Sequence, residues 1–589
     1  AAIYGAQGAN GVVLITTKKG KVGTPVINYN GWVGLNQIIK TQELLNPYEF
    51  VKYQLEQNPT LYTNIYLKDG KTLDDYRGME GINWQDKVFR NAVTHNHSIA
   101  IRGGTDRTRY AISGSLLDQD GIILNSGFNK YQGRVVLDQT VNSKLKVGLN
   151  LNYTAYKRYG TVVSESQPSP TASLMYGIWG FRPITGNSLT DASLIDDLFD
   201  PDMDPSLGTD LRINPYLAVQ NEYNPLFSAN LIANGYFEYK LAEELTFRAT
   251  AGYTRTNQRR EVFFNSKSRA GHPFSTKKVN GSIRNNEITN LLNENTLSYD
   301  RKFKGGHRLK AVVGFTVQDI RNYTNGFTSI LVPNESLGIK GLDEGQITMA
   351  PVTDASSGLM SYLGRVDYNY RSKYLLTLSF RSDGSSKFPK SNRWAYFPSG
   401  SFAWRLKEEN FLKPIKIISD AKLRAGIGST GNNRVSEYAS LTALQMNPAS
   451  GYSVGNSAGQ GMVPTNLGNP NLKWETTVQT NIGLDLSILK NRVSLTTDYY
   501  HKETRDLLLN ATLAPSMGFL TGFKNIGRVS NSGIEFTLET KNVQTPNFSW
   551  NSSFNIAFNK NKVVELNEGE PSLATRVTWG NFNNAYPYI

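Results

Sequence analysis

The sequence predicts an all-β protein built as one large antiparallel barrel that crosses a membrane. Many segments of about 9 to 13 residues alternate apolar and polar side chains. In the segment 374–381 (YLLTLSFR), every second residue from Tyr374 to Phe380 is apolar, and most of the residues between them are polar. A strand needs about 9–11 residues to cross a bilayer, with one face toward lipid and the other toward a wet lumen.

The connections between these segments favour a membrane barrel over a soluble β-sandwich or propeller. Short and long connections alternate along the chain, whereas a soluble fold has no reason to sort its loops in this way. The short connections are 103–108, 140–144, 240–246, 300–307, 371–373, 406–420, 489–492 and 541–547. The long connections are 118–129, 157–228, 258–284, 321–357, 382–393, 429–472 and 503–531.

Composition excludes several other classes of protein. The chain has 589 residues, 39% of them hydrophobic, which argues against wholesale disorder. Cysteine is absent, so there are no disulfides and no thiol nucleophile. The net charge of +14 is scattered and forms no basic run, so we expect no nucleic-acid partner. No apolar run approaches the roughly 18 residues of a membrane helix.

The strand count and the first residues suggest a fragment. About seventeen strands are expected, from 27–37 to 548–559. Bacterial single-chain barrels have even numbers of strands, so we expect further strands beyond the C-terminus. The chain begins without methionine or a visible signal peptide, so we also expect the true N-terminus to lie upstream.

The glycine-rich start AAIYGAQGANGVVLITTKKG does not read as a phosphate-binding loop. Such a loop follows a strand and opens a helix. Here Gly5, Gly8, Asn10 and Gly11 precede a strand-like run at 12–17. These residues are therefore expected to shape a structural turn.

Several stretches together resemble the SusC/RagA-type TonB-dependent transporters of Bacteroidota. The stretches are residues 1–20, 84–104 (WQDKVFRNAVTHNHSIAIRGG), 110–128, 362–388, 394–411 and 467–486 (LGNPNLKWETTVQTNIGLDL). The resemblance implies that residues 1–23 are the C-terminal end of an internal plug domain. Residues 24–589 would then form an incomplete barrel, with about 17 strands present of about 22 in the family.

The resemblance also implies a function. Such a protein lies in the bacterial outer membrane and imports nutrient oligomers actively, driven by the TonB–ExbB–ExbD complex. A SusD-like lipoprotein covers the barrel as a lid. Oligosaccharide is the first expectation for the cargo and peptide the second, and neither an enzymatic activity nor a cofactor is implied. The alternatives are a plug-less porin or surface adhesin, and a soluble basic β-protein that binds polyanions.

Three motifs could carry chemistry of another kind. The stretch 451–455 matches the GxSxG nucleophile elbow, but it lies in a glycine-serine loop with no helix pattern after it, so we expect no hydrolase. Asp200, Asp202 and Asp204 have the spacing of a calcium loop. Pro205 and Leu211 replace the glycine and glutamate of an EF-hand, which leaves a looser Ca²⁺ site or a solvated acidic loop. His95 and His97 lack an evident acidic partner and are expected to be surface histidines.

The long connection 157–228 is a candidate for a partner or cargo contact. It exceeds the length that a compact fold tolerates without a role. Trp179, Phe181 and Arg182 could stack on sugar rings or pack on a partner protein. The alternative is that they anchor a small core of the loop itself.

Overall fold

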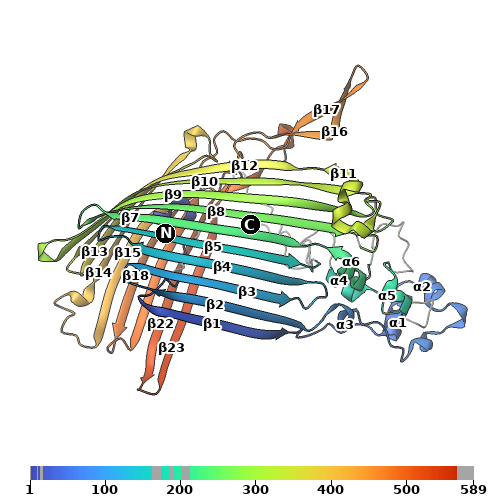
Figure 1. Cartoon of the computed structure of the whole chain (residues 1–589), viewed down its shortest axis with the longest axis horizontal. Helices are drawn as coiled ribbons and strands as arrows, with labels where there is room; N and C mark the ends of the chain where they lie inside the picture. Colours follow the sequence, from blue (N-terminus) through green and yellow to red (C-terminus); the bar gives the residue numbers. More distant parts are fainter. Residues whose placement is uncertain are drawn as a thin grey trace.

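One antiparallel sheet dominates the structure. The structure is a computed structural model that describes residues 2–8, 11–13, 17–161, 163, 174–184, 192–199, 213–268 and 270–566. Nineteen strands join in one curved sheet, and two of them, β6 (Glu222–Tyr223) and β11 (Gln346–Met349), are very short (Figure 1). Without these two, seventeen long strands remain in the described sheet, the number expected from the sequence.

The long strands each have 12 to 24 residues. They are β1 (Gly23–Asn36), β2 (Ala92–Gly104), β3 (Thr108–Asp120), β4 (Gly127–Thr140), β5 (Leu145–Tyr159), β7 (Leu226–Lys240), β8 (Leu245–Phe264), β9 (Asn280–Lys302), β10 (His307–Ile330), β12 (Val352–Tyr370), β13 (Tyr374–Ser385), β14 (Trp394–Arg405), β15 (Ile418–Asn432), β18 (Glu475–Ile488), β19 (Val493–Arg505), β22 (Arg528–Gln544) and β23 (Ser549–Glu565). Each pairs with the next long strand along the chain, and within the described residues β1 and β23 pair on one side only.

The two faces of the sheet differ as the alternation predicts. On β13, Leu376, Leu378 and Phe380 point outward and are 38%, 53% and 52% exposed. The opposite face of the same strand carries Arg381 and Asp383, which are buried. An apolar outer face and a polar inner face are the signature of strands that stand in lipid around a wet lumen.

The two ends of the sheet also differ, as the loop lengths predict. One end, here the short-turn end, carries the connections 105–107, 141–144, 241–244, 303–306, 371–373, 406–417, 489–492 and 545–548. The other end, the long-loop end, carries 37–91, 121–126, 160–225, 265–279, 331–351, 386–393, 433–474 and 506–527. Only 406–417 departs from this sorting by length, since it is longer than 121–126 and 386–393 at the other end.

Three neighbouring strands are longer than the sequence indicates. β8, β9 and β10 have 20, 23 and 24 residues. Their ends near the long loops carry polar residues outward, such as Arg255 and Arg259 on β8, so the alternation that marks a membrane strand fades there. The expected loop boundaries at 258–284 and 321–357 were therefore too wide.

Most helices of the described chain lie at the long-loop end. They are α1 (Pro47–Gln57), α2 (Pro59–Tyr66) and α3 (Trp84–Val88) between β1 and β2, and α4 (Leu174–Gly180), α5 (Ala192–Asp196) and α6 (Pro215–Asn221) between β5 and β7 (Figure 1). The short 3₁₀ turns are η1 (Ala2–Gly8), η2 (Lys68–Gly70), η3 (Leu73–Tyr76), η6 (Lys304–Gly306), η7 (Glu335–Glu344), η8 (Lys390–Asn392), η9 (Leu406–Glu408) and η10 (Pro515–Met517).

Asn46 begins α1 through a capping box with Glu49. None of the helices that the structure describes is both long and apolar enough to cross a membrane.

The connection 429–472 is more regular than expected from its glycine and serine content. It contains the hairpin β16 (Leu444–Val454) and β17 (Ser457–Pro464), which projects away from the barrel wall (Figure 1). Gly455 and Asn456 turn this hairpin with φ values of +58° and +63°. A second hairpin, β20 (Leu508–Thr512) with β21 (Thr521–Asn525), lies between β19 and β22.

Candidate functional site on the inner wall

The N-terminal segment lies against the inner face of the barrel wall. η1 contacts β13, β14 and β15. Arg381 and Asp383 form an ion pair with 2.6 Å between Nε and Oδ1, and their side chains are 9% and 0% exposed. Arg381 Nη1 donates to the carbonyl of Ile3 at 3.0 Å, and the amide of Ala6 donates to Asp383 Oδ2 at 3.1 Å. This docking pair, Arg381 and Asp383, therefore holds the backbone of η1 on both sides of Gly5.

The docking pair leaves space only for glycine at position 5. Gly5 has φ +54°, a conformation that disfavours other residues. A Cβ atom there would lie 2.2 Å from Asp383 Oδ2 and 2.3 Å from Arg381 Nε. Gly8 is also buried, whereas Gly11 has φ +97° and open space around it. The positive φ and the close contact with the docking pair together explain why position 5 is glycine.

The rest of the N-terminal stretch is only partly described. Asn10 and residues 14–16 lie outside the described residues, and residues 12, 13 and 17 do not belong to a strand. The expected boundary between a plug remnant at 1–23 and the barrel stays a prediction, although β1 begins at Gly23.

A second contact fastens the same stretch to another part of the inner wall. Arg134 of β4 donates from Nη2 to Thr17 Oγ1 at 2.7 Å, and its Nε donates to Asn150 on β5 at 3.1 Å. Lys19 Nζ lies 3.8 Å from Asp138 Oδ2. These side chains are more exposed than the docking pair, so each contact contributes less.

The inner wall carries paired charges away from the N-terminal segment as well. Arg424 contacts Asp485 at 2.8 Å and Asp498 at 2.9 Å across β15, β18 and β19. Such pairs keep the lumen polar without a large net charge of one sign.

Among the described residues, no group of three or more histidines and carboxylates could hold a metal ion. Asp200, Asp202 and Asp204 lie outside the described residues, and a Ca²⁺ site there stays a prediction.

At the long-loop end, the connections 37–91 and 160–225 pack on each other. Trp84 Nε1 donates to the carbonyl of Arg182 at 2.9 Å, and the ring of Trp84 meets that of Phe181 edge to face at 5.2 Å. Phe181 and Arg182 are 4% and 3% exposed, and the Arg182 guanidinium lies 5.7 Å from the centre of the Tyr66 ring. Trp179 is 47% exposed. Of the three residues singled out in this loop, Trp179 alone presents a large open surface.

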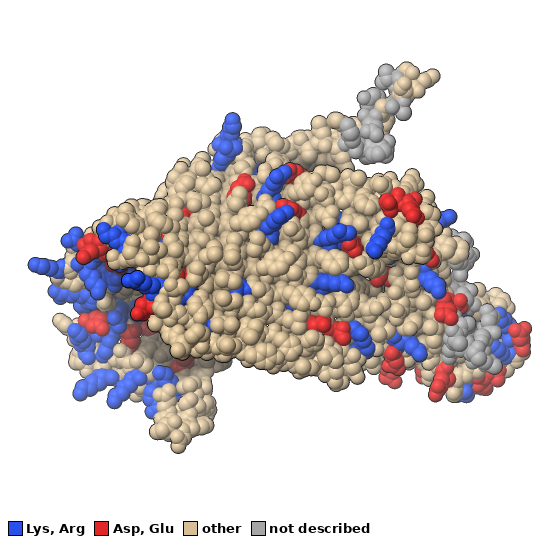
Figure 2. Space-filling view, viewed as in Figure 1, with Lys and Arg blue, Asp and Glu red and all other residues tan. Residues whose placement is uncertain are grey.

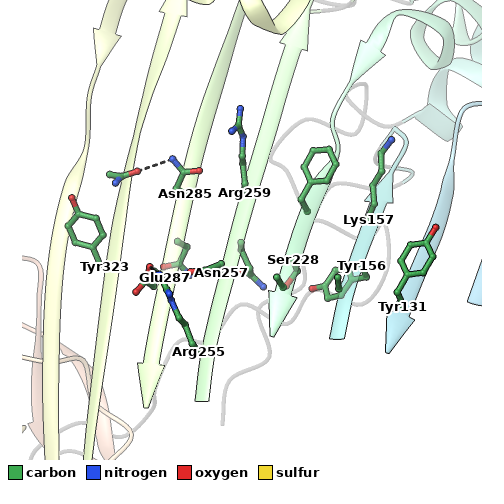
Figure 3. A pocket seen from close by; sticks show the side chains of 16 residues that line it. Tyr131, Tyr156, Lys157, Ser228, Arg255, Asn257, Arg259, Asn285, Glu287 and Tyr323 are labelled. Carbon is green, nitrogen blue, oxygen red and sulfur yellow. Dashed lines mark hydrogen bonds and ion pairs between the residues drawn. The ribbon is translucent and has the colours of Figure 1, made fainter. Parts of the chain in front are cut away.

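A groove of about 650 Å³ lies on the outer face of the wall, near the long-loop end (Figure 3). Lys157 and Ala155 line it, and they continue the outward row that includes Leu149 on β5. Arg255 and Glu287, which also line the groove, are joined at 2.8 Å. Because this groove faces away from the N-terminal segment, it is not part of the lumen.

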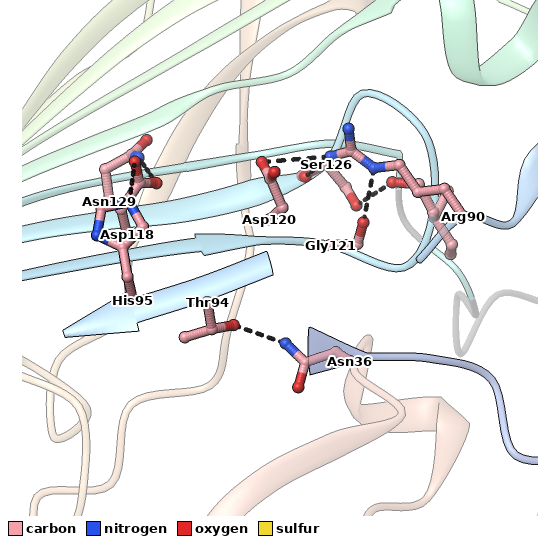
Figure 4. A network of polar contacts seen from close by, with 10 residues as sticks. Asn36, Arg90, Thr94, His95, Asp118, Asp120, Gly121, Ser126 and Asn129 are labelled. Carbon is pink, nitrogen blue, oxygen red and sulfur yellow. Dashed lines mark hydrogen bonds and ion pairs between the residues drawn. The ribbon is translucent and has the colours of Figure 1, made fainter. Parts of the chain in front are cut away.

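The expectation that His95 lacks an acidic partner was wrong. His95 Nε2 lies 3.5 Å from Asp118 Oδ2, and Asn129 donates to the same carboxylate (Figure 4). His97 shares a hydrogen bond of 2.6 Å with Tyr29. Asp118 lies opposite His95 on the next strand, so the contact follows from strand register and not from proximity in the sequence.

A neighbouring network in Figure 4 joins Arg90 to Asp120 at 3.4 Å and to the carbonyl of Gly121 at 3.0 Å.

The GxSxG motif has no helix after it, as the sequence predicts. Ser453 pairs with Ala458 within the β16–β17 hairpin. A nucleophile elbow requires a strand-turn-helix unit, so this serine is not placed for nucleophilic catalysis.

An antiparallel sheet with an apolar outer face, a polar inner face and loops sorted by length defines an outer-membrane β-barrel. Residues 178–588 match the family described as TonB dependent receptor-like, beta-barrel, and the chain belongs to this family. It lies in the bacterial outer membrane. Members of this family are receptors and transporters, not enzymes.

Two relatives and one solved structure illustrate the similarity. TonB-dependent receptor P3 of Formosa agariphila is 33% identical over 97% of this chain and 54% of its own length. TonB-dependent receptor SusC of Bacteroides thetaiotaomicron is 28% identical over 97% of this chain and 56% of its own length. The RagAB peptide importer in its open-open state shares the fold with a TM-score of 0.80 at 24% identity, covering all of this chain and 66% of that one. The chain thus spans about half the length of the curated relatives it matches.

Proposed function

We propose that the protein imports a nutrient oligomer across the outer membrane by TonB-dependent transport. The observation that carries the proposal is the N-terminal segment held on the inner wall by the buried docking pair Arg381 and Asp383. A segment inside the barrel must move before a large solute can pass. Moving it breaks a buried charged contact, which requires an energy source such as the TonB–ExbB–ExbD complex.

The cargo and the lid belong to the same proposal. An oligosaccharide is the preferred cargo, and a peptide is the second candidate. The relative SusC supports the class of transporter, and RagAB, whose fold this chain shares, is a peptide importer. A SusD-like lipoprotein is the proposed partner at the long-loop end. There Trp179 is 47% exposed, two residues from the buried Phe181, and offers a flat apolar surface to a sugar ring or a protein.

Uptake of labelled oligosaccharides and peptides by cells that express the full-length protein tests the proposal. Uptake of one class should disappear when TonB is deleted or when a protonophore collapses the proton gradient. Uptake that continues without TonB would favour the passive porin instead. Removal of the SusD-like lipoprotein should lower uptake at low cargo concentration.

A pair of glycine variants tests whether the docked segment closes the barrel. Gly5→Ala and Gly11→Ala both place a side chain at positive φ, but only Gly5→Ala drives an atom into the docking pair. We expect Gly5→Ala to admit a large antibiotic without TonB and Gly11→Ala to remain closed. Equal leakage from both variants would contradict the role of the docking pair.

A further inference from the structure

A row of ring side chains marks one level of the outer wall at the short-turn end. His307, Tyr370, Tyr374 and Trp404 pair directly across β10, β12, β13 and β14. Successive ring centres are 4.6, 6.3 and 6.3 Å apart. Tyr374 lies on the same face of β13 as the outward residues Leu376 and Leu378. Aromatic rows at the edge of an apolar band lie at the level of the lipid headgroups.

One carboxylate from the adjoining turn fixes this ring row. Glu409 accepts hydrogen bonds from the Tyr374 hydroxyl at 2.7 Å and from Trp404 Nε1 at 2.9 Å. Its other oxygen lies 2.6 Å from Lys373 Nζ. Glu409 therefore holds the two rings in place and balances the charge of Lys373.

Two cations in the turns just beyond the ring row have no carboxylate partner. Lys304 and Arg371, here the basic turn patch, are exposed. The two turns that carry them touch, since the amide of Arg371 donates to the carbonyl of Gly306 at 2.7 Å. The guanidinium of Arg371 lies 5.2 Å from the centre of the Tyr370 ring. Within the described part of the chain, no carboxylate forms an ion pair with Lys304 or Arg371; the nearby Asp300 and Glu409 pair with Arg308, Lys310 and Lys373 instead.

The basic turn patch is part of a wider asymmetry of charge. Figure 2 shows that lysine and arginine predominate at the short-turn end, on the left, with some acidic side chains among them, whereas the two signs are more evenly mixed at the long-loop end. Short turns face the periplasm in outer-membrane barrels, so these cations face the inner leaflet of the outer membrane. That leaflet consists of phospholipids, whose phosphates lie at the headgroup level.

We propose that the basic turn patch binds the phosphate group of an anionic phospholipid from the periplasmic leaflet. The ring row sets the depth of the headgroup, Lys304 and Arg371 reach the phosphate from the turns, and the acyl chains lie along the apolar face of β13. A lipid with a net negative charge is favoured over a zwitterionic one, because the cations repel the positive group of a zwitterionic headgroup and the patch has no free carboxylate to pair with that group. Each cation near an anionic membrane surface contributes about fivefold in binding.

Native mass spectrometry of the full-length protein in detergent tests this proposal. A phosphatidylglycerol and a phosphatidylcholine with the same acyl chains serve as probes. The unmodified protein should bind phosphatidylglycerol more tightly. Lys304→Gln combined with Arg371→Gln should weaken phosphatidylglycerol binding about thirtyfold and phosphatidylcholine binding much less, so that the preference disappears.

Two further variants control for net charge and for folding. Lys277→Gln with Lys340→Gln removes the same charge from exposed positions at the long-loop end and should change binding less than twofold. Lys304→Arg with Arg371→Lys keeps the charge and should keep the preference. Equal losses in the two glutamine double variants, or no preference in the unmodified protein, would overturn the proposal. If the double variant does not fold, Lys304→Gln alone should still weaken binding about fivefold.

Discussion

The outer and inner faces of β13 belong to the same strand but differ in the side chains that they tolerate. Outward, Leu376, Leu378 and Phe380 have no polar group to satisfy, and lipid is their partner. Inward, Arg381 and Asp383 are buried and need each other and the backbone of η1. The outer face therefore tolerates any apolar shape but no charge, whereas the inner face tolerates charge only where its partner is present.

The largest effect is expected where a buried charge loses its partner on the inner face. Asp383→Ala leaves the Arg381 guanidinium without its carboxylate partner at a site that is almost inaccessible to solvent. We expect it to lower the free energy of unfolding by about 3–5 kcal/mol. Urea titration of the protein in detergent measures this loss. Replacing both residues by apolar ones should cost less than Asp383→Ala alone, and the opposite order would contradict the argument.

The next effect is expected on the outer face. Leu149→Arg puts a charge among lipid-facing residues of β5 and should cost about 2–4 kcal/mol if it lies near the middle of the bilayer. Thr154→Arg, on the inner face of the same strand, is the matched control and should be mild. Urea titration in lipid vesicles compares the two variants. Equal costs would show that the faces are assigned wrongly.

A smaller effect is expected at the more exposed contact of the N-terminal stretch. Thr17→Val removes the hydrogen bond from Arg134 Nη2. The loss should be about 0.5–1.5 kcal/mol, because water can replace part of the bond. Thr24→Val, at an exposed position of β1, provides the control. If Thr17→Val lowers the free energy of unfolding as much as Asp383→Ala does, then the burial of a contact does not determine how much it contributes to stability.

The smallest effect concerns the carboxylate behind the ring row. The hydrogen bond and charge of Lys373, followed by the bonds from Tyr374 and Trp404, lower the pKa of Glu409 from 4.5 to about 2. Because this pKa is lower in the folded state, its contribution to stability is complete above pH 4.5 and is lost as the pH falls toward 2. The difference in unfolding free energy between the unmodified protein and Glu409→Gln should be constant above pH 4.5 and shrink below it. A difference that grows on acidification would contradict this sign.

The sequence predicts those parts of the fold that local pattern determines. β13 was predicted because one face is apolar from Tyr374 to Phe380, and the tight turn 371–373 marks where the strand begins. The outer parts of β8 and β10 were missed because residues such as Arg259 and Arg321 end the alternation while the strand pairing continues.

The candidate site depends on contacts that local patterns do not encode. Gly5 was noticed as a turn residue, but its docking pair lies more than 370 positions away. The contact of His95 with Asp118 depends on register between strands. Trp84 was not singled out, since its partner Phe181 belongs to another loop.

The distance along the chain between Ala6 and Asp383 has a consequence for the order of folding. The two residues are 377 positions apart, and closing so long a flexible loop costs about 4 kcal/mol more than closing a four-residue hairpin. Once the strands between them have paired, that entropy has already been lost, and docking becomes nearly local. The N-terminal segment therefore attaches late, after the transition state of barrel formation. Mutations that weaken the contact between the N-terminal segment and the docking pair should accelerate unfolding and leave the rate of folding almost unchanged.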